Sequence, residues 1–542
     1  MSGALLQLAA LGSQDPYLTG NPEITFFKKK ISRYTNFSTG TSQVNFDGTG
    51  VNFGTMQTAT IDNSGDLIYK LILVLKLEKN TSKTWGYVNR LGHAIIDNIS
   101  INIGGTEVDV MYGDFMYMYN ELNRNDSHDD NFDKMIGNIP SLKNIDVDHD
   151  EYTLYIPLHF WFTKSTFLSF PICSLYNQNF QVTVTLNDAI DCINFKGTTE
   201  PTDLPNIITS YLLVDYIYLD IEEQTLFKTK TDKHEYLIEQ VQELTDNINL
   251  ETSRINIAFD KPCKYIIWAT NLDRFYNRNK YLSFAFDNDF ENARTNFAKL
   301  VWLATRNGLN MTDPDNPKII FTSSFVNIGE IPEMITGGNT VLETLANKVK
   351  GIILFAENIN NNIQANATID NVVLTENNIT FEDMSKTIDE IKEGENTTTQ
   401  QNTFLDKNTL NIIDVFNFGN FIDRTDNPII SSALLLNGRD KFQERDSNYF
   451  NSIVPYYNFN NKPADGINVY SFSIDPMNVE PSGTINFGMI NDNKELIIRI
   501  GKEGKQNTNY FNNYFKNGRM RIFAYNYALL TVSPKLNTII IN

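Results

Sequence analysis

The feature that most constrains the fold is an alternation of apolar and polar residues with a period of two, which dominates residues 40–221. In Asn98–Ile103, isoleucines alternate with polar residues, and Phe180–Leu186 follows the same pattern. Successive side chains of a strand point to opposite faces, so this pattern predicts strands with one buried face. Gly104-Gly105 separates the first segment from Thr106–Met111, which predicts a tight hairpin because the favoured turns need positive φ.

A second series of apolar segments follows residue 250 and predicts a second β-rich unit. Its strand candidates are Arg254–Phe259, Tyr265–Ala269, Ile467–Ile474, Glu495–Ile500 and Arg519–Val532. Helices are expected to be short, as in Gly113–Leu122, where apolar residues recur on one helical face. Many short strands without alternating long helices are typical of sandwiches and barrels. The predicted fold class is therefore all-β, with two tandem eight-stranded antiparallel jelly rolls, short helices and a large loop insertion in the second.

The domain organisation follows from where these strand series begin and end. We expect an N-terminal arm, a first jelly roll, a polar and charged connector, a second jelly roll and a C-terminal tail. Their predicted bounds are 1–24, 25–221, 222–249, 250–534 and 535–542, respectively. An insertion at about 274–425 interrupts the second roll, between two strand candidates that a short loop would usually join. It contains apolar β-like pieces, but its acidic tract has too few apolar residues to pack and is expected to be mobile.

The composition excludes several classes of protein. The net charge of -20 is unsuited to direct contact with nucleic acid, which needs Lys and Arg to neutralise phosphates. The 36 Phe and 25 Tyr favour half-buried strands. Three cysteines, at 173, 192 and 263, show no metal-ligand spacing and are too few for a disulfide framework, so reduced thiols are expected. The N-terminal residues do not resemble a secretory signal, and no segment has the roughly 20 apolar residues that a membrane-spanning helix needs.

No catalytic, cofactor-binding or metal-binding residues are predicted. The five histidines, at 93, 128, 149, 159 and 234, lack the spacing of the ligand set of a jelly-roll enzyme. Neither a nucleophile elbow nor a phosphate-binding loop pattern occurs. Asp146, Asp148 and Asp150 resemble the start of a calcium loop, but Glu151 stands where that loop needs Gly. A solvated acidic turn is the interpretation we favour there.

Several segments, in the same order along the chain, resemble the double jelly-roll major capsid proteins of nucleocytoplasmic large DNA viruses. This family includes those of phycodnaviruses, iridoviruses and mimivirus-like viruses. The matching segments in the first half are Gly3–Phe37, Trp85–Leu122, Ile156–Leu186 and Val214–Gln242. Those in the second half are Leu434–Tyr456, Ile467–Phe487 and Arg519–Val532, and the long segment near 274–425 has no counterpart that can be aligned. The resemblance implies a structural shell protein and not an enzyme.

The resemblance also implies partners and a location. Three copies would form a pseudo-hexagonal capsomer, and such capsomers would tile the outer shell of an icosahedral virion, with minor capsid proteins on the inner side. The chain would be made in the host cytoplasm. Independently of the resemblance, we expect the insertion to face outward and to contact the host surface. A carbohydrate-binding β-sandwich and a jelly-roll enzyme remain as alternative functions. Light scattering distinguishes the carbohydrate-binding protein from the capsid protein by molar mass, because a capsomer should be a tight trimer and a carbohydrate-binding protein need not be.

Two features of the N-terminal region have alternative interpretations. Lys28, Lys29 and Lys30 form the clearest basic run, which predicts contact with an acidic partner or with lipid head groups under the shell. The alternative is a strand end with solvated lysines. An apolar stripe of four leucines, at 5, 6, 8 and 11, predicts a short helix that either docks on a neighbour or straps its own barrel.

Overall fold

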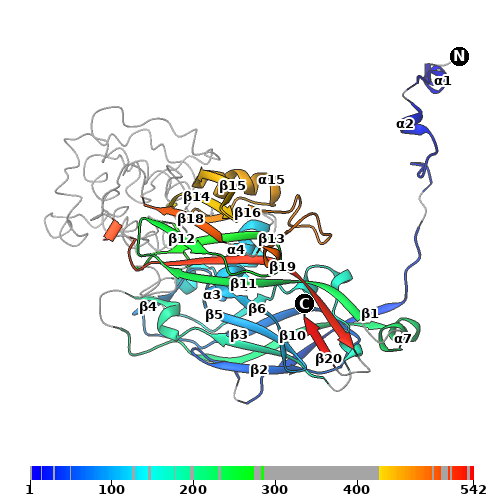
Figure 1. Ribbon diagram of the computed structural model, residues 1–542. Coiled ribbons are helices and arrows are strands. Elements are labelled where there is room, and N and C mark those ends of the chain that lie inside the picture. Colours follow the sequence, from blue (N-terminus) through cyan, green and yellow to red (C-terminus); the bar gives the residue numbers. More distant parts are fainter. Residues whose placement is uncertain are drawn as a thin grey trace, which may run out of the picture.

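The structure is a computed structural model in which two packed pairs of β-sheets lie side by side and the N-terminal residues extend away from them (Figure 1). It describes residues 3–13, 15–28, 31–48, 50–124, 129–143, 148–175, 178–195, 200–229, 234–273, 282–285, 427–490, 493–501, 511–512, 515–533 and 538–541. Almost all of the predicted insertion, about 274–425, therefore lies outside the described residues.

The first pair of sheets has the strand orders β1–β10–β3–β7 and β2–β8–β5–β6. The bounds are β1 (Phe37–Asn45), β2 (Met56–Ile61), β3 (Leu67–Leu77), β5 (Ile96–Ile103), β6 (Thr106–Tyr112), β7 (Tyr152–Pro157), β8 (Phe180–Leu186) and β10 (Ile207–Leu219). Neighbouring strands are antiparallel. Strands β4 (Trp85–Tyr87) and β9 (Ile193–Phe195) form a separate two-stranded sheet.

The second pair of sheets repeats these orders as β11–β19–β13–β16 and β12–β18–β14–β15. The bounds are β11 (His234–Asn247), β12 (Thr252–Asn256), β13 (Pro262–Asn271), β14 (Ile429–Leu436), β15 (Arg439–Asp446), β16 (Ile467–Ser471), β18 (Lys494–Ile500) and β19 (Arg519–Ser533). Two short strands, β17 (Ile485–Asn486) and β20 (Thr538–Ile541), pair with β13 and β19. The chain is thus all-β with two jelly rolls, as predicted.

The local sequence explains these strands and their turns. Strand β8 has the predicted bounds, and its residues alternate between buried and half-buried positions. Gly104 and Gly105 have φ of 59° and 84°, and Asn437 and Gly438 have φ of 51° and 70°, so both hairpins use the left-handed region that their residues favour. The first jelly roll was predicted to extend to residue 221, but its last strand ends at Leu219, because Ile221 begins a helix.

The connector predicted for 222–249 is wrong over most of its length. The structure has helix α7 (Ile221–Thr229) there, followed by β11, which pairs with β19 from His234 to Asn247. The segment was assigned as a connector because it is rich in polar and charged residues. Those residues are accommodated in a strand because Glu239 and Gln240 find buried partners on other elements.

The described helices are short; the first two precede β1, and the others lie between strands. They are α1 (Gly3–Ala9), α2 (Pro16–Thr19), α3 (Leu91–Ala94), α4 (Gly113–Asn123), α5 (Asp129–Met135), α6 (Pro140–Lys143), α7 and α15 (Val454–Asn458). A π-helix, η10 (Tyr449–Ile453), leads directly into α15. Among the 3-10 helices is η2 (Trp161–Thr163), after β7. Within the described residues, no helix is long and apolar enough to cross a membrane.

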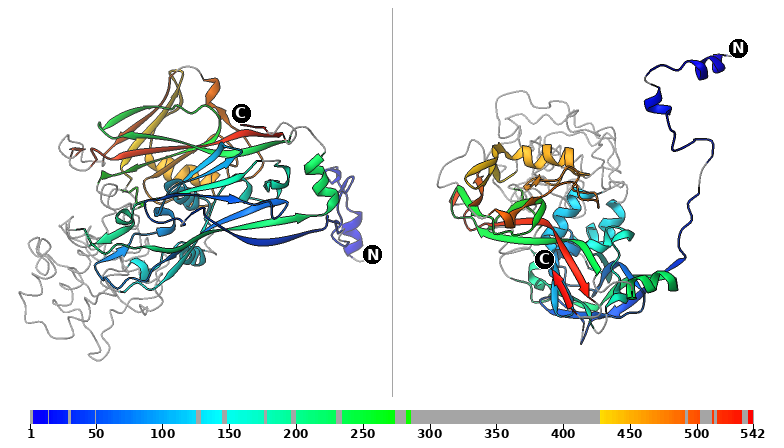
Figure 2. Two further views of the ribbon diagram at one scale, coloured as in Figure 1. Left: turned by 90° about the horizontal axis from the view of Figure 1, so that it is seen from below. Right: turned by 45° about the vertical axis from the view of Figure 1, so that its right-hand side comes forward.

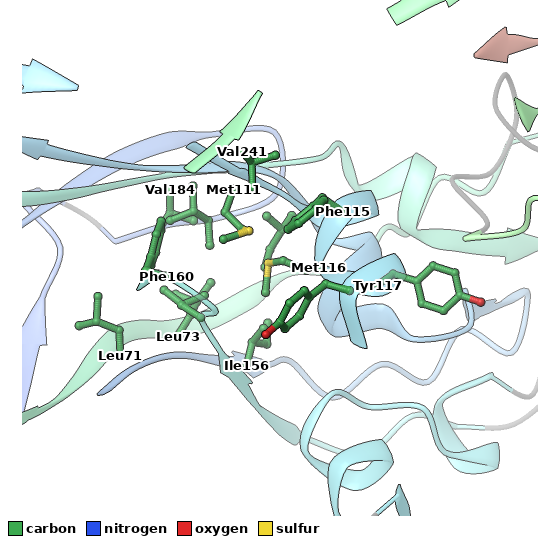
Figure 3. Packing of buried hydrophobic residues seen from close by; sticks show 14 of the residues in the cluster. Leu71, Leu73, Met111, Phe115, Met116, Tyr117, Ile156, Phe160, Val184 and Val241 are labelled. Carbon is green, nitrogen blue, oxygen red and sulfur yellow. The ribbon is translucent and has the colours of Figure 1, made fainter. Parts of the chain in front are cut away.

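Two hydrophobic cores fill the described part of the molecule, and the first extends beyond its own jelly roll. The first core contains β3, β5, β8 and α4 residues, and Figure 3 shows Val241 of β11 beside Met111 and Phe115. Phe523 and Tyr525 of β19 also belong to it. The second core lies between the two sheets of the second roll, around Trp268 and Phe450. One sheet of the second roll is therefore buried on both faces.

Candidate assembly surfaces

The two jelly rolls are joined by aromatic packing of α4 on β19. The ring of Phe115 lies 5.5 Å from that of Phe523 and 5.8 Å from that of Tyr525, between centroids. Tyr119, one helical turn further on, lies 6.3 Å from Tyr525. Aromatic rings at such separations add to the stabilisation from apolar burial. Two aromatic residues of the apolar face predicted for this helix are thus buried against the second roll.

A buried ion cluster lies beside these rings. Glu239 of β11 accepts hydrogen bonds from Lys164 and Lys264, each at 2.5 Å, and from the Tyr525 hydroxyl at 3.0 Å. Lys164 follows η2 in the first roll and Lys264 lies in β13, so one carboxylate is shared by both rolls. Burial raises the pKa of Glu239, but the two ammonium groups outweigh burial and hold this pKa below its usual value.

A second polar contact joins the edges of β6 and β11 without a strand ladder. Asp109 of β6 accepts from the backbone N–H of Val241 at 3.2 Å and of Val110 at 2.9 Å. Gln240 donates to the carbonyl of Val108. Burial raises the pKa of Asp109 to about 8, and the N–H donors lower it only in part. The two side chains thus provide hydrogen-bond partners for backbone groups at the edges of β6 and β11, which would otherwise be buried without partners.

Arg521 of β19 makes a third link across the junction. Its guanidinium binds Glu243 of β11, with Nε to Oε1 at 2.9 Å, and Asp114 of α4. Burial lowers the pKa of Arg521, and the two carboxylates outweigh that effect and raise it. A planar guanidinium suits this arrangement because it can donate to two carboxylates at once.

The C-terminal end of α4 binds the loop that precedes β16. The backbone N–H of Asn461 donates to the carbonyl of Leu122 at 3.1 Å, and that of Ala464 donates to Glu121 at 3.2 Å. Glu121 also pairs with Arg90 at 2.9 Å. The junction is therefore continuous along α4, and it holds the two rolls in one relative orientation. Sequence reasoning missed it, although the charged residues within the alternating segment 234–247 were an available signal.

Among the described residues, exposed large apolar side chains gather on the N-terminal arm and on η10–α15. Helix α1 has no buried residue, and Leu5, Leu6, Leu8 and Leu11 are all exposed. The arm leaves the first roll before β1 and extends away from both rolls (Figure 2). This arrangement does not match a strap on its own barrel. On η10 and α15, Ile453, Tyr456 and Tyr457 are 47%, 79% and 76% exposed, respectively.

The basic run beside the arm is described only in part. Lys28 is exposed, whereas Lys29 and Lys30 lie outside the described residues. The acidic turn is also partly described: Asp148 pairs with Lys83 at 3.6 Å and Asp150 pairs with Lys79 at 2.8 Å, while Asp146 is not described. Lysine partners neutralise the two described carboxylates.

The described histidines and cysteines form no metal site and no disulfide, and most of them are buried in the packed interior. His149 stacks on Trp85, and its Nε2 lies 2.9 Å from the carbonyl of that residue. Burial lowers the pKa of His93 to about 3 and that of His159 to about 4. Among the described residues, no group of three or more His, Cys, Asp or Glu could hold a metal ion, and the three cysteines are not bridged. His128 lies outside the described part.

Two family models match the chain in succession and cover both jelly rolls. Residues 25–220 match the model described as major capsid protein N-terminus. Residues 226–536, more than half of the chain, match the model described as large eukaryotic DNA virus major capsid protein. The chain belongs to this family of major capsid proteins. Membership confirms the resemblance found in the sequence and the prediction of a structural protein that is not an enzyme.

Relatives in this family match almost the whole chain. The major capsid protein of Phaeocystis pouchetii virus is 29% identical, and the match covers 98% of each chain. Capsid protein 1 of Acanthamoeba polyphaga mimivirus is also 29% identical, again with 98% of each chain covered. These relatives are shell components, and virion localisation follows for a member of the family.

Solved structures of capsid proteins share the fold. The PBCV-1 capsid matches with a TM-score of 0.58 and 21% identity, over 94% of this chain and 97% of that chain. The Faustovirus major capsid protein matches with a TM-score of 0.58 and 9% identity, over 98% and 96%. At such identities the likeness shows the fold alone.

Proposed function

We propose that three copies of the chain form a capsomer with six similar barrels, and that such capsomers tile the outer shell of an icosahedral virion. The observation that carries this proposal is the repetition of the same strand orders in both halves of one chain. Three chains with two similar rolls each can form a ring of pseudo-sixfold outline. Membership in the capsid family supports assembly with copies of itself.

The rigid junction supports the same function. A subunit of a closed shell needs a fixed angle between its two rolls, because closure of a symmetric ring depends on the rotation between neighbours. Glu239, Arg521 and Asp109 each link both rolls through buried groups. Such contacts resist hinge motion more than the exposed polar interfaces common between domains.

Light scattering coupled to size exclusion tests the proposal. The expected molar mass is three times the 61.9 kDa of the chain, unchanged on dilution to micromolar concentration. Obligate interfaces are large and apolar, and they resist dilution. A molar mass of one chain at micromolar concentration would contradict the proposed capsomer.

The arm is the part we place on the inner side of the shell. Its exposed leucines fit docking on a neighbouring subunit or on a minor capsid protein, and its reach beyond both rolls supports this role. Exposed Lys28, with Lys29 and Lys30 beside it in the sequence, fits proximity to an inner membrane, where basic residues meet anionic lipid. We propose no direct contact with nucleic acid, in keeping with the net charge of -20.

The remaining assignments extend this proposal to the other parts of the chain. We place the first roll at 25–221 and the second at 250–534. Strand β11, which begins at His234, is added to the second roll because it pairs with β19. The insertion at about 274–425 is assigned to the outer face, in contact with the host surface, and synthesis to the host cytoplasm. Deletion of about residues 376–410 should then leave the molar mass of three chains unchanged, whereas monomers would contradict this placement.

A further inference from the structure

The two rolls repeat a local unit besides their strand orders. In the first roll, the hairpin β5–β6 leads directly into helix α4. In the second roll, the hairpin β14–β15 leads into η10 and α15. Each hairpin lies at the same place in its sheet, with β6 and β15 at the edges. Helices α4 and α15 are therefore structural equivalents.

Helix α4 packs on one defined face of the second roll. Along β19, Ile522 and Ala524 point into the second core, whereas Phe523 and Tyr525 alternate with them and join the first core. The face that α4 covers is therefore the outer face of the sheet β11–β19–β13–β16. The contact within the chain thus joins the helix of one roll to the outer face of the next.

The equivalent outer face of the first roll belongs to the sheet β1–β10–β3–β7. Leu71, Leu73 and Leu75 of β3 point into the first core, so the residues between them point outward. The outward positions form cross-strand pairs of apolar residues, Ile72 with Leu213, and Val74 with both Tyr211 and Tyr155. None of these five residues belongs to either core. Val74 is fully buried within the chain, Ile72, Tyr211 and Leu213 are half-buried, and Tyr155 is 40% exposed.

The equivalent helix of the second roll exposes an apolar stripe. Ile453, Tyr456 and Tyr457 have the spacing i, i+3 and i+4, which places them on one helical face. Phe115, Met118 and Tyr119 of α4 have the same spacing and are buried, and the rings of Phe115 and Tyr119 contact β19 of the second roll. Exposed tyrosines with this spacing are typical of interface cores, where Tyr is enriched.

We propose that the α15 stripe of one copy packs on the outer face of β1–β10–β3–β7 of the next copy. This contact repeats between chains what α4 does within a chain, and it rests on the proposed trimer. It is heterologous, because the two surfaces differ, so three such contacts close a ring. An apolar contact also suits copies that each carry a net charge of -20, because it brings few like charges together.

Substitution of the stripe tests the contact. The Tyr456→Ser/Tyr457→Ser variant should fold as the parent chain does, because both side chains are exposed, and circular dichroism checks this. The concentration at which trimers dissociate should rise at least tenfold. Phe167→Ser is the matched control, since Phe167 is 94% exposed on the first roll, and it should leave that concentration unchanged. A double variant whose trimers are as stable as those of the parent would overturn the assigned interface.

Crosslinking identifies the face directly and does not depend on the stability of a variant. A benzophenone amino acid at position 456, in a mixture of isotopically light and heavy chains, should give crosslinks between chains to peptides of β3, β7 or β10. The same group at position 167 should not. Crosslinks from position 456 to another surface of the next copy would overturn the interface while leaving the trimer intact. Parent chains that are monomeric would contradict the proposed function instead.

Discussion

Glu239 of β11 and Lys164 of the first roll form a buried ion pair across the boundary of the two jelly rolls, with Oε2 and Nζ 2.5 Å apart. The same carboxylate binds Lys264 of β13, whose side chain is fully buried. The ammonium of Lys164 also lies 4.3 Å from the ring centroid of Tyr525. One carboxylate therefore compensates two buried cations at the place where the rolls meet.

Replacement of this carboxylate should destabilise the chain strongly. Glu239→Gln leaves two buried ammonium groups without a counter-charge, and removal of one partner of a buried pair costs about 3–5 kcal/mol. Urea unfolding measures the loss. Glu495→Gln is the matched control, because Glu495 pairs with the exposed Arg254 and such pairs contribute about 1 kcal/mol or less. Equal losses in the two variants would contradict a structural role for the cluster.

The pH dependence of stability should change when Asp109 is replaced. The pKa of Asp109 is raised to about 8 in the folded chain, above its value of 3.8 when unfolded, so its contribution is present below pH 3.8 and is lost as the pH rises toward 8. Asp109→Asn removes this loss and keeps an oxygen for the two N–H donors. The stability of the variant relative to the parent should therefore increase between pH 5 and pH 8, by about 1 kcal/mol per unit.

Urea unfolding at both pH values checks this expectation. Asp114→Asn serves as the control, since Asp114 is paired with Arg521 and its replacement should cost a similar amount at both values. A difference between Asp109→Asn and the parent that stays constant from pH 5 to pH 8 would show that Asp109 is ionised throughout.

Two glycines with positive φ should respond differently to the same substitution. Gly438 has φ of 70° in the β14–β15 turn, and a Cβ there would meet nothing within 4 Å, so Gly438→Ala should cost about 1 kcal/mol of backbone strain. Gly466 has φ of 90°, and a Cβ there would lie 1.9 Å from the carbonyl oxygen of Phe284. Gly466→Ala should therefore cost more than about 3 kcal/mol, among the larger effects of point mutants. Thermal unfolding compares the two, and equal shifts would contradict the close packing at Gly466.

Removal of the arm should separate folding from shell assembly. Apart from the half-buried Asp15, the described residues among the first twenty are exposed, so trimers of a chain that lacks them should form as before. Assembly of shells should fail or slow, because the exposed leucines are proposed to dock on a neighbour. Electron microscopy of assembly reactions gives the readout, with a variant that carries serine at 5, 6, 8 and 11 as a milder change. Normal shells from the shortened chain would refute an assembly role for the arm.

The sequence predicted local structure well and the junction poorly, for a physical reason. Alternation defined β8 to the residue, and Gly104-Gly105 identified the β5–β6 hairpin, because these signals are contained in a few neighbouring residues. Strand β11 was assigned to a connector because its polar residues are stabilised by partners distant in the sequence, such as Lys164 for Glu239.

The same limit applies to the two equivalent helices. The spacing of apolar residues is alike in α4 and in η10–α15, yet one stripe is buried and the other exposed. Periodicity shows that a face is apolar, but not which surface covers it. That information comes from the packing of the rolls, which places β19 against α4 and leaves Tyr456 and Tyr457 in solvent.

Cryo-electron microscopy of the purified assembly tests both the capsomer and the contact between its chains. We expect particles of three chains whose reconstruction shows six barrels in a pseudo-hexagonal ring, with α15 of each copy against the sheet β1–β10–β3–β7 of the next. Two results would contradict this arrangement. One is a reconstruction in which first and second rolls do not alternate around a single ring, and the other is one in which neighbouring chains meet through other faces.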